Sequence, residues 1–159
     1  MRVHIFKTRQ YGFTIVELVS VLVIGGILAA VIMPKLGAGT GFDERAFRDR
    51  VVAGLRFAQK SAIASRRTVC ASFSAPPASV NFRISTTNGA ANCVVGSALA
   101  GPDSPLLVVT ATGNVSFAAL PADVIFDAAG RPGSGAAISI SGLPAALAIT
   151  IEAETGYVH

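Results

Sequence analysis

Apolar residues form an almost unbroken run from Phe13 to Met33, and the carboxylate of Glu17 is its one charged group. A helix needs about 20 apolar residues to cross the roughly 30 Å hydrocarbon core of a bilayer. The run therefore predicts a transmembrane helix at residues 13–33. A charge inside such a segment costs roughly 2.5–3.5 kcal/mol on insertion scales, so we expect Glu17 to have a partner or a function.

The pattern becomes amphipathic between Phe42 and Ser65, where apolar residues recur at steps of three and four. We predict an amphipathic helical spine at residues 34–66, and we interpret its basic residues as a solvated face. Pro34 and the glycines at residues 37–41 are expected to disturb the helix near its start. The apolar stripe consists of Phe47, Val51, Leu55, Ala58 and Ala62.

Beyond residue 67, short segments alternate apolar and polar residues between turn signals, which predicts β-strands. Residues 68–74 and 79–85 flank Pro76-Pro77 and predict a hairpin. We therefore expect a β-rich head over residues 67–159 and an α+β fold class. Further strands are predicted at residues 106–112, 114–117, 124–126, 137–141 and 147–152.

Basic residues cluster before the apolar run. Arg2, Lys7 and Arg9 supply three of the positive charges behind the formal net charge of +4, and no acid accompanies them. By the positive-inside tendency, this end is expected in the cytoplasm and the rest of the chain across the membrane. An ordinary signal peptide, cut near residues 37–39, is the alternative. The length of the apolar run and its internal acid argue against it.

The junction at Gly12 resembles the class III signal of type IV pilins and type II secretion pseudopilins, because a short basic leader ends in glycine and Phe-Thr-Ile-Val-Glu follows. The resemblance implies that a prepilin peptidase removes residues 1–12 by cutting between Gly12 and Phe13, and then methylates the amine of Phe13. It implies that Glu17 pairs with a neighbouring subunit's amine during assembly. The chain would then be a single-pass protein of the bacterial inner membrane, with a periplasmic C-terminal domain.

The C-terminal half is similar to the GspH/FimT group of minor pseudopilins and pilins. Residues 126–132, 149–151 and 155–158 carry this resemblance, and residues 44–65 also look like MshC-type minor pilins. The implied fold is pilin-like, with a long N-terminal helix packed on an antiparallel sheet. The implied role is to initiate or cap a type IV pilus or a type II secretion pseudopilus, with other major and minor pilins or pseudopilins and inner-membrane lipid as partners.

The two cysteines, Cys70 and Cys93, lie in the part expected outside the cytoplasm. Disulfides persist in the bacterial periplasm, and closing a loop of this length stabilises by roughly 3 kcal/mol. We favour a disulfide, with two buried free thiols as the alternative. Two cysteines without clustered histidines do not make a zinc site, so no metal is predicted.

Catalytic groups are scarce in this sequence. The two histidines, His4 and His159, lie near the ends of the chain. We therefore expect no histidine in a position to act as the base of a Ser-His-Asp triad. Asp123 and Asp127 flank a predicted strand, and we interpret them as surface residues. We predict neither enzymatic activity nor a cofactor.

DNA binding is the alternative function, because FimT-like minor pilins are linked to DNA uptake through a C-terminal Gly-Arg-x-Arg motif. Here Gly130-Arg131-Pro132-Gly133 keeps the first arginine and has glycine in place of the second. Phosphate binding depends on several cations acting together. Arg131 is therefore a candidate DNA contact, while a turn shaped by the two glycines is the interpretation that we favour.

Overall fold

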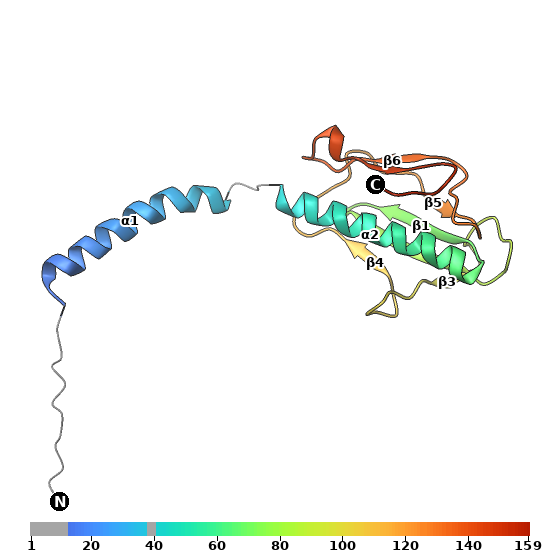
Figure 1. Ribbon diagram of the computed structural model, residues 1–159, viewed down its shortest axis with the longest axis horizontal. Helices are drawn as coiled ribbons and strands as arrows, with labels where there is room; N and C mark the ends of the chain where they lie inside the picture. The colour runs from blue at the N-terminus through green and yellow to red at the C-terminus, as the bar shows by residue number, and fades with distance from the viewer. Residues whose placement is uncertain (1–12, 38–40) are drawn as a thin grey trace, which may run out of the picture. The chain divides into compact units, whose positions relative to one another are not determined.

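The computed structural model describes residues 13–37 and 41–159, with side chains described at 13–30 and 41–159. The chain separates into two compact units, residues 1–40 and 41–159. The first unit contains helix α1 (Ile15–Gly37), and the second contains helix α2 (Phe42–Ser65) followed by the strands (Figure 1). Helices followed by antiparallel strands confirm the predicted α+β class.

Helix α1 does not end at Pro34, because its backbone continues to Gly37. The expected disturbance at Pro34 therefore does not terminate the helix. Among the residues that the structure describes, no helix combines the length and the hydropathy that a membrane span requires. The transmembrane segment expected at residues 13–33 remains a prediction.

Helix α2 packs across one face of an antiparallel five-stranded sheet (Figure 1). The central hairpin pairs β1 with β2, and β5 pairs with the other edge of β1. Strands β3 and β4 pair with the two ends of the remaining edge of β2. The strands are β1 (Val69–Ser74), β2 (Ser79–Ser85), β3 (Gly96–Ala98), β4 (Val108–Thr110) and β5 (Val124–Phe126).

A second, two-stranded sheet is formed by β6 (Ala136–Ile138) and β7 (Ile149–Ile151), with the 3-10 helix η1 (Ala145–Leu147) between them. The end of the chain adds to this sheet. Thr150 and His159 exchange backbone hydrogen bonds of 2.8 and 2.9 Å. The last residues are therefore held against β7.

The core lies between α2 and the two sheets. All five residues of the predicted apolar stripe of α2 are fully buried, and α2 covers the stretch from Phe42 to Ser65 in which the amphipathic pattern occurs. The spine predicted at residues 34–66 began earlier, but residues 34–37 belong to α1. The ring of Phe117 lies 5.5 Å from that of Phe47 and 5.6 Å from that of Phe73, between centroids. Aromatic pairs at this spacing add to the stabilisation from apolar burial.

Three details of the predicted strands are wrong. The strand expected at residues 114–117 is reduced to a single bridge between Phe117 and Ile140. Leu147, the first residue of the strand expected at residues 147–152, instead ends η1, and β3 was not predicted. The Gly-Ser-Ala sequence of β3 has no alternation of apolar and polar residues, and only its pairing with β2 makes it a strand.

Candidate functional site

Helix α1 begins directly after the predicted cleavage site. The Thr14 hydroxyl accepts a hydrogen bond of 3.2 Å from the Glu17 N–H, and the Thr14 carbonyl accepts one of 3.1 Å from the Leu18 N–H. Thr at the N-cap with Glu three residues later is the capping-box pattern, and the carboxylate also suits the positive end of the helix dipole. Residues of the predicted processing signal therefore also define the start of the helix.

The large side chains in the described part of α1 are exposed. Phe13 is 84% exposed, and the large apolar side chains from Ile15 to Leu28 are each at least 52% exposed. Glu17 is exposed as well. A helix that is apolar on every side is stable only in apolar surroundings, such as lipid or the helices of other subunits.

The structure places Phe13 and Glu17 at the same end of α1, and both are accessible. Gly12, on the other side of the predicted cut, lies outside the described residues. Cleavage, methylation of Phe13 and pairing of Glu17 with a neighbour's amine therefore stay predictions.

Comparison with known proteins addresses this end of the chain. Residues 7–33 match a protein-family model described as the prokaryotic N-terminal methylation motif. The match supports a type IV pilin-like protein. A pilin-type motif also indicates processing by a prepilin peptidase and association with other pilins. No curated protein and no solved structure matches the chain.

A disulfide joins Cys70 and Cys93 in the unit of residues 41–159. Their Cα atoms lie 6.0 Å apart, and the sequence separation is 23 residues. Both residues are buried, so the bond fastens the loop after β2 to strand β1. Neither cysteine is a free thiol.

Gln59 joins α2 to two C-terminal turns. No motif or periodicity in the sequence marks this residue. Its Nε2 donates hydrogen bonds to the Thr155 carbonyl at 2.8 Å and to the Gly130 carbonyl at 3.2 Å. Gly156 has a φ of 66°, and a Cβ there would collide with the Gly130 carbonyl oxygen. Only glycine therefore allows this close approach. The stretches around residues 59, 130 and 156 therefore meet at one amide.

Two arginines of α2 also bind the C-terminal segment. Arg48 Nε donates to the Leu147 carbonyl at 2.9 Å, and Arg56 Nε donates to the Val158 carbonyl at 3.0 Å. The interpretation of the basic residues as a solvated face is therefore wrong for Arg48, whose side chain is only 21% exposed, while Arg56 stays exposed although it binds the C-terminal segment. Their long apolar stems let the guanidinium groups reach the neighbouring backbone, which helical periodicity cannot reveal.

Arg131 takes part in a closed turn with Asp127. Asp127 Oδ1 accepts hydrogen bonds from the backbone N–H groups of Arg131 at 2.9 Å and Ala129 at 2.8 Å, and Oδ2 lies 3.6 Å from Arg131 Nε. The hydrogen bond from the Arg131 N–H is the main cause that lowers the pKa of Asp127 below 3.8, against a smaller opposing effect of burial. This geometry supports the turn-forming interpretation of the glycine-rich sequence.

Asp123 extends the pairing of β5 with β1. Its Oδ2 accepts a hydrogen bond of 3.0 Å from the Ser72 hydroxyl, and its Oδ1 accepts one of 3.3 Å from the Phe73 N–H. Asp123 and Asp127 thus each bind local donors in separate places. This arrangement agrees with their interpretation as surface residues, and the absence of enzymatic activity stays a prediction.

Proposed function

We propose that this protein is a minor pilin or pseudopilin that helps to initiate or cap a type IV pilus or a type II secretion pseudopilus. The observation that carries the proposal is the methylation motif at residues 7–33, which coincides with the start of an exposed apolar helix. The head, residues 41–159, is a separate compact unit with its own core and disulfide. One unit can therefore enter an assembly while the other keeps its fold.

Assembly would use the charges at the start of α1. Cleavage after Gly12 leaves a positive amine on Phe13, and Glu17 presents a carboxylate that is accessible to an adjacent subunit. In a low-dielectric setting, pairing neutralises two charges that are costly to leave alone. Such a pair would set the stagger between neighbouring subunits.

Glu17→Gln tests the charge pair separately from helix capping, because glutamine also serves in a capping box. We expect the variant to be processed normally, so that mass spectrometry finds an N-methylated Phe13 at its start, yet to be lost from the filament or tip complex. Asp43→Asn is the matched control, since it removes an acid from the first turn of α2. If Glu17→Gln assembled as well as the wild type, the charge-pair mechanism would be wrong.

An intact leader, or a mature chain that begins elsewhere than at N-methylated Phe13, would contradict the proposed function itself. The initiating or capping role depends on contacts with other subunits. We expect the full chain to co-purify with other minor subunits of the same system at a low, defined stoichiometry. Incorporation along the whole filament would instead indicate a major subunit.

DNA binding by Arg131 can be separated from assembly. The Arg131 side chain is 57% exposed, so its guanidinium is accessible although it faces Asp127. A gel shift that weakens with salt and disappears in Arg131→Ala would favour the DNA-binding alternative. We expect no such shift, because a single arginine neutralises too few phosphates.

A further inference from the structure

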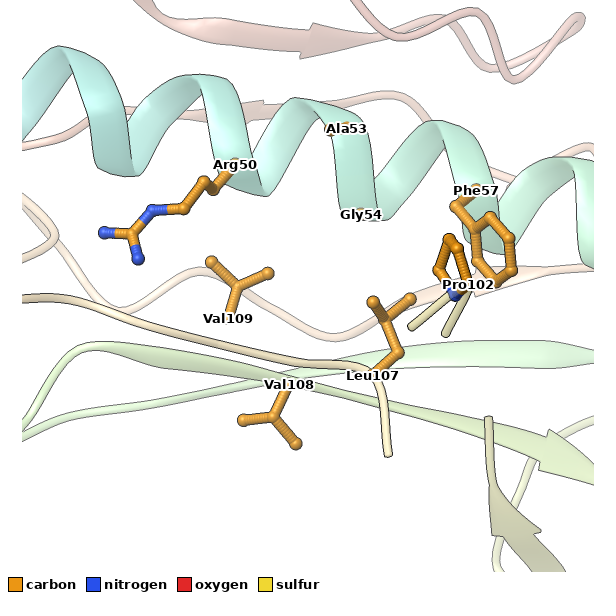
Figure 2. Close-up of a pocket in the computed structure, with 8 residues that line it drawn as sticks. All are labelled: Arg50, Ala53, Gly54, Phe57, Pro102, Leu107, Val108 and Val109. Carbon is orange, nitrogen blue, oxygen red and sulfur yellow. The ribbon is translucent and has the colours of Figure 1, made fainter. Parts of the chain in front are cut away.

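An apolar groove of about 290 Å³ lies between α2 and the segment that leads into β4 (Figure 2). Phe57, Leu107 and Pro102 line one end. Gly54 faces the sheet, where an added Cβ would lie only 2.8 Å from Cζ of Phe82. The missing side chain lets α2 approach the sheet closely at this point. Ala53, beside Gly54, is exposed at the rim.

Arg50 lies at the other end of this groove, with its side chain extended from α2 (Figure 2). Its Nε makes one long hydrogen bond, 3.4 Å to the Ala46 carbonyl on its own helix. Arg48, two residues earlier, has a carboxylate partner in Asp49 at 3.0 Å. Among the described residues, the ion pairs leave Arg50 without a carboxylate. The groove thus combines an apolar wall with a cation that can accept an external anion.

We propose that this groove binds a peptide segment of a neighbouring subunit in which large apolar side chains are followed directly by a carboxylate. The apolar side chains would pack against Phe57 and Leu107, which are only partly buried against the core. The carboxylate would pair with Arg50, whose planar guanidinium suits two-point binding. The proposal rests on the assembly function proposed above and names the chemistry of one of its contacts.

The dimensions of the groove favour peptide side chains over a lipid. A volume of about 290 Å³ is at the lower end of ligand pockets, which hold roughly 300–1,000 Å³. Arg50 and Ala53 at its rim are exposed, so a long acyl chain would remain partly in water. Apolar side chains with an adjacent carboxylate match both the wall and the charge.

The test uses the full chain in zwitterionic lipid nanodiscs, with labelled methyl groups followed by NMR. The probe is the peptide acetyl-Leu-Leu-Asp-amide. Its neutral counterpart has Asn in place of Asp, its polar counterpart has Ser in place of both Leu residues, and decanoate represents a lipid. We expect the Leu-Leu-Asp peptide to shift the methyl signals of Leu107 and Val109, and the neutral and polar peptides to bind about tenfold more weakly.

Two pairs of variants locate the binding. Arg50→Glu should weaken binding of the Leu-Leu-Asp peptide about tenfold or more, while Arg45→Glu, an exposed arginine of the same helix, should leave it unchanged. Ala53→Leu fills the rim without touching the core and should also abolish the shifts. Ala64→Leu adds the same side chain at an exposed position of α2 outside the groove and serves as its control.

Several outcomes would overturn the proposal. These are no shift with the Leu-Leu-Asp peptide, equal binding of the Asp and Asn peptides, or stronger binding of decanoate than of the peptide. The occupant proposed is a segment of a different subunit, so a concentration-dependent shift of the chain alone would assign the groove to a second copy and would also overturn the proposal. N-terminal processing is measured separately, so a failure of peptide binding would not contradict cleavage at Gly12 or assembly through Glu17. An unprocessed chain would instead contradict the assembly function on which this proposal rests.

Discussion

Helices α1 and α2 have nearly equal lengths, 23 and 24 residues, but they differ in where their partners lie. The large apolar side chains of α1 from Ile15 to Leu28 are exposed, whereas the apolar stripe of α2 is fully buried against the sheets of its own unit. Even polar side chains of α2, such as Arg56 and Gln59, are used to bind the C-terminal segment. The second helix therefore finds its partners within its own unit, whereas the described part of the first does not.

A matched pair of leucine truncations gives the largest test of this comparison. Leu55 is fully buried, and Leu22 is 66% exposed. We expect Leu55→Ala to lower the free energy of unfolding of the head by about 3 kcal/mol, because it leaves a cavity in the core. Leu22→Ala should leave head stability unchanged. Native-state hydrogen exchange of the β1 amides measures the stability of the head in both variants. An equal loss of stability in the two variants would contradict the difference between the helices.

Removing the disulfide should destabilise the head by about 3 kcal/mol, because the unfolded chain gains the entropy of an open loop. Cys70→Ser combined with Cys93→Ser makes this change, and exchange of the β1 and β2 amides reports it. Reduction of the wild-type protein should reproduce the effect. Unchanged exchange in both cases would show that the packing of α2 alone holds the head together.

Gln59→Ala should cost about 1–2 kcal/mol, because the carbonyls of Gly130 and Thr155 both lose a donor. Lys60→Ala is the control. Lys60 is the exposed next residue of the same helix, and we expect its replacement to change stability by less than about 0.5 kcal/mol. Faster amide exchange confined to residues 149–159 in Gln59→Ala would show that this amide holds the C-terminal segment. If the two variants had the same stability and the same amide exchange, the hydrogen bonds of Gln59 would not be what holds the C-terminal segment against α2.

The smallest expected effect is a pH dependence at Asp127, whose side chain is 49% exposed. Its pKa in the folded state lies below 3.8, so the charged carboxylate stabilises the fold above that pH, and this contribution is lost as the pH falls through the folded-state pKa. Acid unfolding followed by circular dichroism should therefore be steeper below pH 3.8 in the wild type than in Asp127→Asn.

Arg131→Ala separates the two causes of that pKa shift. The variant keeps the backbone N–H donors, so it should retain most of the pH dependence. Loss of the whole dependence in Arg131→Ala would show that the ion pair, and not the backbone hydrogen bonds, holds the carboxylate charged.

Much of the local structure could be predicted because it depends on neighbours in the chain. The spacing of Phe47, Val51 and Leu55 identified the buried face of α2, and the alternation around Pro76-Pro77 identified the β1–β2 hairpin. The methylation motif was likewise readable as a short continuous pattern. The pairing of the small residues 96–98 with β2 was not, because their sequence carries no strand signal.

Residue types a few positions apart were enough to predict the two kinds of helix, the central hairpin and the N-terminal motif. Folding brings Gln59 to the Gly130 carbonyl across 71 residues and Arg56 to the Val158 carbonyl across 102, and neither contact could be predicted from the sequence. Folding also leaves Arg50 beside an apolar groove while Arg48 is paired. A donor binds whichever carbonyl or carboxylate the folded chain brings within about 3 Å. The periodicity of residues along the chain gives no information about which distant groups come that close.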